Sequence, residues 1–394
     1  MTRTSTATEE PTAEESTTEE STTEEDAEPS GPLYESIEPS AQSMLVRPIG
    51  EPMKTTVYRD GSGVLRTGQD GDRTEVGALS RELGRPAVLC TNRKNHWLLV
   101  TGSWRERGTA YVYRSAADLT AHRPAAELGG VFPPQRGAVM PFRDRRSGEV
   151  GFVWAEYHLA SPSAIRVLRA ASTPTGGYTI EPVYSLSTAD RDSYFHFHSF
   201  DIDPYRPNTL YATTGDPNPN PQFYRPRNYG RDWRPVPGAG GTQTFRTLRI
   251  NFGEEYLYWA MDGWNHGGAE ACSFCRAPRS DPSDMEEIGR IGGEKQVTLS
   301  YGSARTFDSD GILVTVRTKE LRKVPLYFYD LETEAFSEVH EFPTDYDLHH
   351  IPGVTATMPY RNRRTKRVSM LPYGVPNSED YEQFWVELDP RKLV

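Results

Sequence analysis

The stretch AYVYR, residues 110–114, decides the fold because close copies of it recur along the chain. Each copy is a short run of strand-favouring residues, and the clearest copies end in arginine. The copies are TTVYR (55–59), AYVYR (110–114), IRVLR (165–169), PQFYR (221–225) and CSFCR (272–276), with the weaker PLYFYD (325–330) and EQFWVELD (382–389). Successive arginines of the five clear copies are 55, 55, 56 and 51 residues apart. This spacing indicates a structural unit of about 50 residues that occurs seven times.

A second pattern, an apolar stretch, a polar turn and another apolar stretch, precedes the later copies. Examples are LCTNRKNHWLLVTG (89–102), INFGEEYLYWAMDG (250–263) and MPYRNRRTKRVSMLPYG (358–374). Gly, Asn, Asp and Pro in the turns are typical of β-hairpins. Each unit therefore holds a hairpin, a third strand and a fourth, and a four-stranded sheet repeated radially is a propeller blade. The best helical pattern, ADLTAHRPAAELGG (117–130), contains a proline.

These repeats predict an all-β fold, a seven-bladed β-propeller over residues 31–394, with six blades as the alternative. The first blade lacks a clear hairpin, which residues 32–48 could supply. The last copy ends at its third strand, so an N-terminal strand is expected to complete the last blade. A composition of 31 Pro, 33 Gly and many aromatic residues fits an architecture of many short strands.

Residues 1–30 differ from the rest of the chain. They hold ten acidic residues and one arginine, so most of the formal net charge of −11 lies there and the remainder carries about −2. With almost no apolar residues, this segment is expected to be a disordered acidic tail, which could contact a basic partner. The nearly neutral body argues neither for nor against nucleic acid, and our prediction names none as partner.

The sequence shows no signal peptide and no apolar run long enough to span a membrane. We therefore expect a cytoplasmic, virion-associated or surface-associated protein. Three cysteines cannot form a disulfide framework, and Cys272 and Cys275 stand as a lone C-x-x-C pair. A zinc site would need two more ligands, so buried small residues on strands are the plainer interpretation.

The stretch H-x-H-S-F-D-I-D-P (196–204), followed by FYRPRNYGRDW (223–233), resembles the BNR/Asp-box, sialidase-like propeller superfamily. That family caps a turn between two outer strands with the motif S-x-D-x-G-x-x-W. Here Pro226 and Asn228 replace the Ser and Asp, whereas Gly230 and Trp233 match. Because such boxes are structural turns, the resemblance implies the fold more than a function.

In propellers, loops from successive blades meet over the central channel, which makes a natural binding site. By this mapping, six of the nine histidines fall on one face, and Trp, Arg and carboxylate residues accompany them. The candidate catalytic residues are His196, His198 and His266. The candidate substrate-binding residues are Glu156, His158, Asp216, Arg246, Asp262, Trp264, Tyr301, Arg317, His349 and His350.

His196 and His198 are two apart on an expected strand, so their side chains point the same way. This suits a shared divalent metal, with His266 as a further ligand, or one anionic substrate group. Polar residues on inner strands also commonly hydrogen-bond neighbouring blades and buried water, and this structural alternative stays open. Trp264 and His266 in a glycine-rich loop suit stacking on a sugar ring.

We therefore expect carbohydrate recognition at this face, with or without cleavage. The sialidase pattern of three arginines is incomplete, since Arg246 and Arg317 are the assignable ones and the nearest match to the family's R-I-P motif is Arg47-Pro48-Ile49, out of order. Propeller polysaccharide lyases, which use histidine as a base and sometimes a metal, are the closer functional comparison. The alternative is a non-catalytic attachment protein or protein-interaction scaffold.

Overall fold

The computed structural model divides the chain into two compact units, Met1–Pro32 and Leu33–Val394. All described residues belong to the second unit. They are residues 34–40, 56–59, 64–69, 72–78, 83, 86–92, 94–135, 137–157, 164–187, 196–206, 208–215, 218–262, 272–291, 298–305, 311–318, 323–343, 360–361, 368–370 and 383–388. The predicted boundary of the acidic tail at residue 30 and its disorder lie outside them and stay predictions.

The described strands form seven antiparallel sheets, six with four strands and one with three. The three-stranded sheet contains β2 (Thr56–Arg59), β3 (Val64–Gln69) and β4 (Asp72–Ala78). The next contains β5 (Pro86–Thr91), β6 (Trp97–Thr101), β7 (Gly108–Tyr113) and β8 (Ala126–Val131). The third contains β9 (Val139–Arg143), β10 (Val150–Ala155), β11 (Ala164–Ser172) and β12 (Tyr178–Ser187).

The fourth sheet contains β13 (Phe197–Ile202), β14 (Leu210–Thr214), β15 (Gln222–Tyr224) and β16 (Pro235–Gly240). The fifth contains β17 (Asn251–Phe252), β18 (Tyr256–Ala260), β19 (Ser273–Pro278) and β20 (Glu286–Arg290). The sixth contains β21 (Thr298–Arg305), β22 (Gly311–Thr318), β23 (Lys323–Asp330) and β24 (Phe336–Pro343). The seventh contains β25 (Tyr360–Arg361), β26 (Val368–Met370), β27 (Gln383–Leu388) and β1 (Tyr34–Ser40).

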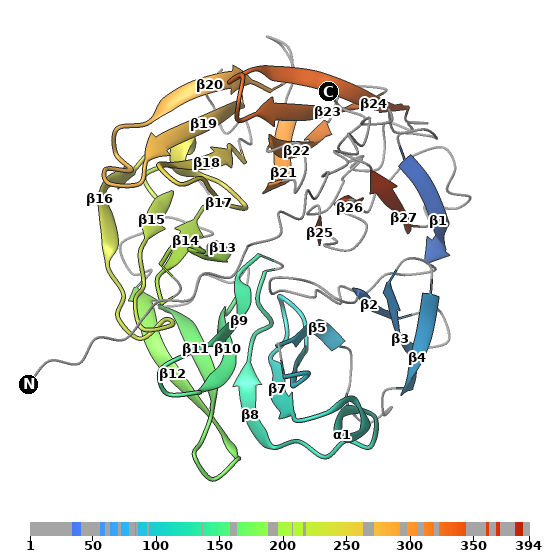
Figure 1. Ribbon diagram of the computed structural model, residues 1–394. Coiled ribbons are helices and arrows are strands. Elements are labelled where there is room, and N and C mark those ends of the chain that lie inside the picture. Colours follow the sequence, from blue (N-terminus) through green and yellow to red (C-terminus); the bar gives the residue numbers. More distant parts are fainter. Residues whose placement is uncertain are drawn as a thin grey trace, which may run out of the picture. The chain divides into compact units, whose positions relative to one another are not determined.

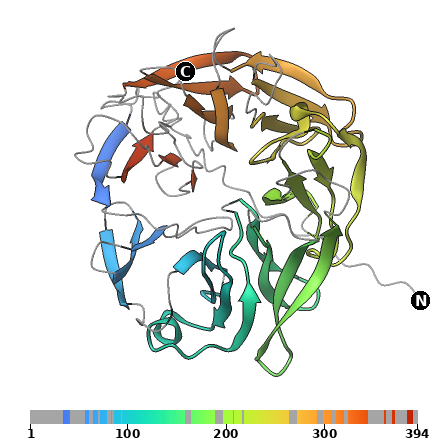
Figure 2. The same cartoon turned by 180° about the vertical axis from the view of Figure 1, so that it is seen from behind.

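The sheets of this unit follow one another around a ring, as Figure 1 shows and Figure 2 shows from behind. β9 contacts β5 on one side and β13 on the other, and β21 likewise contacts β17 and β25. Strand pairing confirms the expected order of hairpin, third strand and fourth strand in the six four-stranded sheets. In the three-stranded sheet the copy TTVYR is β2, an edge strand that precedes β3 and β4, so its expected place as a third strand is wrong. That the seven sheets are the seven blades of a closed ring remains a prediction.

The N-terminal strand completes the last sheet. β1 pairs antiparallel with β27, from Tyr34 opposite Leu388 to Ser40 opposite Gln383. The expected closing strand is therefore confirmed. The other expectation for residues 32–48, a hairpin for the first sheet, is wrong for β1, because its backbone hydrogen bonds are used by β27.

The hydrophobic core is a series of layers between successive sheets. One cluster joins β5–β8 to β9–β12, the next joins β9–β12 to β13–β16, and two more extend the series to β24. Alternating residues of a strand face opposite sides, so the middle strands are apolar on both faces, as in the fully buried VGFVWA of β10. Trp259 lies between two sheets, packs on Phe223 and Phe245, and donates its indole hydrogen to Thr244 O at 2.8 Å.

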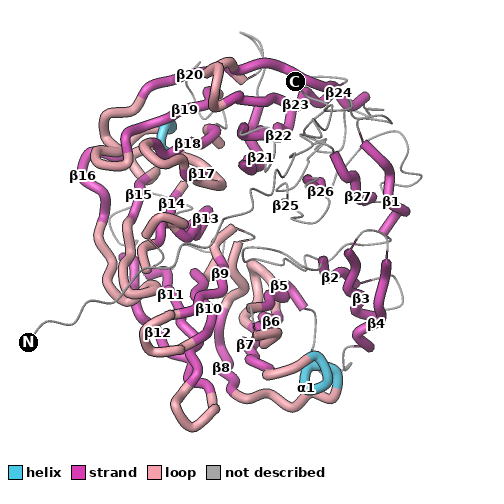
Figure 3. The backbone as a smooth tube through the Cα atoms, viewed as in Figure 1, coloured by secondary structure: helices cyan, strands magenta, loops and turns pink. Residues whose placement is uncertain are grey.

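Helix is rare among the described residues, as Figure 3 shows. α1 (Ala116–Thr120) occupies the start of the sequence that favoured a helix, and Ser115 caps it by accepting from Asp118 N. The second half of that sequence is not helical. β8 begins two residues after Pro124, a residue that cannot continue a helix. Cys90, Cys272 and Cys275 are buried, as the plainer interpretation of the cysteines expected. Cys90 lies on β5 and Cys275 on β19, whereas Cys272 directly precedes β19.

The turn from β15 to β16 holds the Asp-box-like sequence. Gly230 has φ +83°, a conformation that favours glycine, and the Trp233 indole donates to Gly230 O at 2.7 Å. The Trp233 ring stacks on Tyr184 of the preceding sheet at 4.9 Å. Asn228, which stands where the family has Asp, donates to Asp232. The turn is therefore a structural cap, as the resemblance implied.

Candidate functional site

Three neighbouring sheets bring polar side chains together at their strand ends. Tyr157 follows β10, while His196 and His198 lie at the start of β13. Arg246 follows the short helix η2 (Gln243–Phe245), and Asp262 follows the isolated bridge between Thr247 and Met261. We call Tyr157, His196, His198, Arg246 and Asp262 the polar cluster.

The two histidines and the Arg–Asp pair form one connected group. The rings of His196 and His198 are 4.6 Å apart between centroids, and Tyr157 packs edge-on against His196, also at 4.6 Å. His198 Nδ1 lies 3.5 Å from Asp262 Oδ2, and Arg246 Nε lies 3.3 Å from the same oxygen. The expectation that the H-x-H pair faces one way is met, and Asp262 is the carboxylate that lies close to both His198 and Arg246.

Burial determines the charge of the cluster. His198 is 1% exposed, and His196, Arg246 and Asp262 are also buried. Burial above all, then the electrostatic influence of His196 and Arg246, holds the pKa of His198 well below its usual range, although a hydrogen bond with the Thr247 backbone acts the other way. His198 is therefore a neutral imidazole at neutral pH, beside the ion pair of Arg246 and Asp262.

Close backbone packing fixes the position of the His198 ring. A Cβ built on Gly215 would lie 1.9 Å from two atoms of that ring, and a Cβ on Gly137 would lie 2.2 Å from His198 O. Gly215 therefore leaves room for the His198 ring, and Gly137 leaves room for the His198 backbone. On the other side of the cluster, Asp262 N donates to Arg246 O at 2.7 Å, which ties the ends of two strands together.

Glu156 has a structural environment. Its carboxylate accepts from Arg166 Nε at 2.7 Å and Nη2 at 2.5 Å, and from Phe132 N at 3.0 Å. These bonds tie Glu156 to the loop after β8 and to β11, away from the contacts that join the polar cluster. Substrate binding by Glu156 stays a prediction. It is not favoured by these contacts, because both carboxylate oxygens already accept hydrogen bonds.

The remaining predicted site residues cannot be placed in the cluster. Tyr301 lies on β21 and Arg317 on β22, and for both residues the structure describes the strand but not the side chain. Six others lie outside the described residues: His158, Asp216, Trp264, His266, His349 and His350. Their gathering at one face stays a prediction.

The described residues offer no group of three His, Cys, Asp or Glu side chains placed to hold a metal ion. Within that part of the chain, His198 has Asp262 as a carboxylate neighbour, and its oxygen already lies close to Arg246. A divalent metal at His196 and His198 therefore depends on His266 and stays a prediction.

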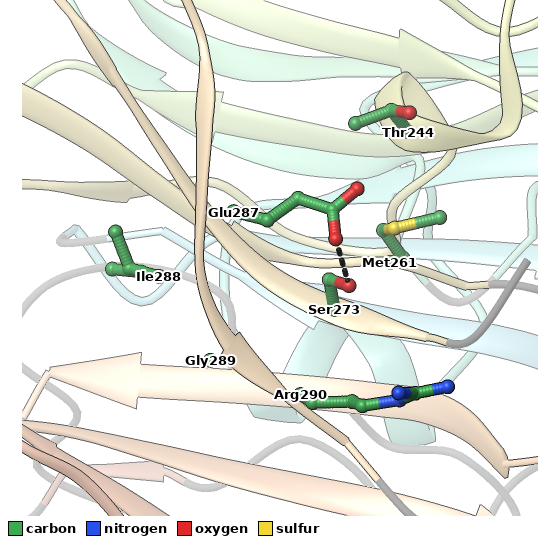
Figure 4. A pocket seen from close by; sticks show the side chains of 7 residues that line it. All are labelled: Thr244, Met261, Ser273, Glu287, Ile288, Gly289 and Arg290. Atoms are coloured by element: carbon green, nitrogen blue, oxygen red, sulfur yellow. Dashed lines mark hydrogen bonds between the residues drawn. The ribbon is translucent and has the colours of Figure 1, made fainter. Parts of the chain in front are cut away.

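A cavity of about 570 Å³ lies at the fifth sheet and is lined by sequence neighbours of the cluster. Met261 and Thr244 line it, one and two residues from Asp262 and Arg246, and Figure 4 shows them around Ser273 and Glu287. The Ser273 hydroxyl donates to the Glu287 carboxylate at 2.6 Å. The volume suits a small organic ligand, and the lining offers hydroxyl, carboxylate and, from Arg290, guanidinium groups.

The sequence-based prediction missed two residues, Gln243 beside the cluster and Glu287 in the cavity. Gln243 Oε1 accepts from Arg246 Nη1 at 3.4 Å, and its amide donates to Asn218 Oδ1 at 3.0 Å. Its position three residues before Arg246 could have indicated it, because that spacing spans one helical turn. Glu287 carries no comparable signal, since it lies on an outer strand beside another glutamate.

Comparison with known proteins supports the fold alone. No protein-family model and no curated protein matches the sequence. The structure of U3-55K is similar with a TM-score of 0.50 at 8% identity, over 90% of this chain and 98% of that one. The WD40 β-propeller domain of Doa1 gives 0.48 at 10% identity (91% and 97% covered), and the RRP9 WD40 repeats give 0.49 at 8% (90% and 97%).

The chain has a β-propeller fold. The sheet order and the likeness to U3-55K agree on this, whereas membership of the sialidase-like superfamily is not shown by either. No helix in the described part of the chain is both long and apolar enough to cross a membrane.

Proposed function

We propose that this propeller recognises a carbohydrate at the polar cluster and the cavity at the fifth sheet. The observation that carries the proposal is the convergence of His198 and Arg246 on Asp262 at the strand ends, together with a cavity lined by hydroxyl and charged groups. Buried ionisable groups with shifted pKa values concentrate at functional sites, although structural networks also shift them. Sugar hydroxyl groups both donate and accept hydrogen bonds. The cavity offers acceptors and donors to match them, from Ser273, Thr244, Glu287 and Arg290.

Replacement of Glu287, which lines the cavity, is the most direct test of the proposal. Glu287 lies on a strand edge, so its replacement should leave the buried cluster intact. Isothermal titration with a panel of soluble glycans, including uronate polymers, should identify a ligand for the intact protein. Glu287→Gln should then weaken binding about tenfold, because a charged hydrogen bond to the ligand becomes a neutral one.

Glu254→Gln is the matched control. Glu254 is an exposed glutamate of the same sheet, in the turn at the opposite strand ends. Its replacement should leave affinity unchanged. Equal loss in both variants, or no binding to any glycan in the panel, would overturn carbohydrate recognition.

Cleavage is a separate step that the same samples can test. A polysaccharide lyase needs a base to remove a proton next to the uronate carboxylate, and His196 and His198 are the histidines that the cluster offers for this role. Incubation with uronate polymers should produce unsaturated product absorbance if cleavage follows binding. Heat of binding without absorbance would identify a binding protein.

A protein-interaction scaffold is the second candidate, favoured by Trp104. This residue is 38% exposed in the turn between β6 and β7, where Ser103 and Glu106 exchange two backbone hydrogen bonds. The Arg105 guanidinium lies 4.1 Å from the ring centroid. Exposed Trp beside Arg is typical of interface hot spots. This candidate gains weight if no glycan binds and Trp104→Ala abolishes binding of peptides selected against the intact protein.

A further inference from the structure

Arginine-rich turns lie at the strand ends opposite the polar cluster. The turn from β9 to β10 carries Arg143, Arg145 and Arg146. The turn from β13 to β14 carries Arg206, and the turn from β15 to β16 carries Arg227, Arg231 and Arg234. All seven side chains are exposed. We call these three segments the arginine turns.

The three turns form one surface. Arg231 Nη2 reaches Glu149 Oε1 at 3.4 Å, which joins the outer turn of one sheet to the inner turn of its neighbour. Tyr229 stacks on Phe142 at 5.3 Å, and Tyr229 N donates to Asn208 O. The arginines of two sheets are therefore presented together.

Two of the four carboxylates near the arginine turns already pair with buried arginines. Glu149 pairs with the buried Arg169, with Nη2 to Oε2 at 2.5 Å. Asp203 pairs with the buried Arg279 through two bonds of 2.7 and 2.6 Å. Asp144 and Asp232 remain as the other acids of the turns. Seven exposed arginines against these two leave a formal charge of +5 on a body that is nearly neutral overall.

Buried side chains beneath the turns and hydrogen bonds within them hold the backbone of the turns in position. The Arg169 guanidinium packs over Phe142 at 4.4 Å, and that of Arg279 packs over Tyr205 at 4.5 Å. The Asp144 carboxylate accepts from Ser147 Oγ at 2.7 Å and Arg146 N at 2.9 Å. A pre-ordered surface loses less conformational entropy on binding.

We propose that the arginine turns are a docking surface for an acidic protein segment rich in Asp and Glu. Guanidinium groups pair with carboxylates through two parallel bonds, and Tyr205, 46% exposed among them, supplies an aromatic anchor. Asp144 and Asp232 interrupt the positive charge, which disfavours a continuous phosphate backbone. The near-neutral body also gives little long-range attraction for nucleic acid.

A labelled peptide of alternating glutamate and serine, ten residues long, tests the proposal by fluorescence anisotropy on the full chain. The peptide should bind, and the double variant Arg145→Gln/Arg227→Gln should weaken it about tenfold, the sum expected of two exposed charge pairs. Both residues are exposed, so folding should be unaffected, which circular dichroism and thermal melting verify.

Arg114→Gln/Arg123→Gln is the matched control, with two exposed arginines outside the surface. It should bind the peptide as the unaltered protein does. Equal weakening in both double variants would indicate general charge attraction and overturn the proposal. So would equal binding of a glutamine–serine peptide, the absence of binding, or tighter binding of duplex DNA at the same salt concentration. None of these outcomes depends on whether a glycan binds at the polar cluster.

Discussion

The two ends of β13 differ in the burial of their ionisable side chains. At its start, His196 and His198 are buried, and His198 shares Asp262 with Arg246. At its end, the chain turns through Asp203 to an exposed Arg206 amid the arginine turns. One strand of six residues thus separates a closed polar cluster from an open, positively charged surface.

The difference shows where charge affects stability and where it is available for binding. A buried ion must be paired, and removing its partner is costly because the remaining charge stays out of water. An exposed ion is solvated and screened, so it contributes little to stability and remains free to meet a partner. Mutation of the cluster should therefore lower the free energy of unfolding, whatever it does to glycan binding, whereas mutation of the arginine turns should change binding with little effect on stability.

The largest expected effect follows from Asp262→Ala. It leaves Arg246 buried without its carboxylate and removes the neighbour of His198 Nδ1. We expect the free energy of unfolding to fall by about 3 kcal/mol, the size typical of a broken buried ion pair. Urea unfolding followed by tryptophan fluorescence measures it.

Asp232→Ala is the counterpart in the arginine turns. Asp232 is exposed, so its loss should change the free energy of unfolding by less than about 0.5 kcal/mol. If the two variants were equally stable, the contrast between a closed cluster and an open surface would be wrong.

The repeat made the sheets predictable, because strand alternation and turn residues are local signals. The copy IRVLR forms part of β11. Its final residue, Arg169, is buried against Glu149 and Phe142, so this repeated arginine has a structural role. The expected closing strand was also found, as β1. Local patterns specify such elements because each residue's facing follows from its position in the strand.

The site was less predictable, because it depends on non-local pairing. Glu287 faces Ser273 across a register shift, in which Phe274 pairs with Gly289 but Cys275 pairs with Glu287. Such a bulge changes which alternate residues share a face, and the sequence EEIGR does not reveal it. The approach of Asp262 to His198 likewise joins residues of two sheets, which the periodicity of either strand cannot specify.

A smaller effect is expected from pH. Folded His198 stays neutral where the unfolded chain, with the usual histidine pKa of about 6.5, takes up a proton. The unfolded state then binds more protons, so the free energy of unfolding should fall as pH drops below 6.5, by up to about 1.4 kcal/mol per pH unit until folded His198 also protonates. Urea unfolding at several pH values between 7 and 5 measures this slope.

His198→Gln isolates the contribution of this ring. Burial lowers the pKa of His96 and His340 as well, and both act in the same direction. The variant should therefore reduce the slope without removing it. Asp144 and Asp330 have pKa values below 3.8 and titrate outside this range. An unchanged slope in His198→Gln would mean that the buried ring does not stay neutral.

The smallest effect is expected from Arg145→Gln/Arg227→Gln on stability. Both side chains are solvated among like charges, so neutralising them should change the free energy of unfolding by less than about 0.5 kcal/mol. The direction should be stabilising at low salt, because repulsion within the arginine turns decreases, and the gain should disappear when salt screens that repulsion. A destabilisation that persists in high salt would show that these arginines hold the turns together, as Arg169 and Arg279 do beneath them, and would remove the reason to regard them as free for a partner.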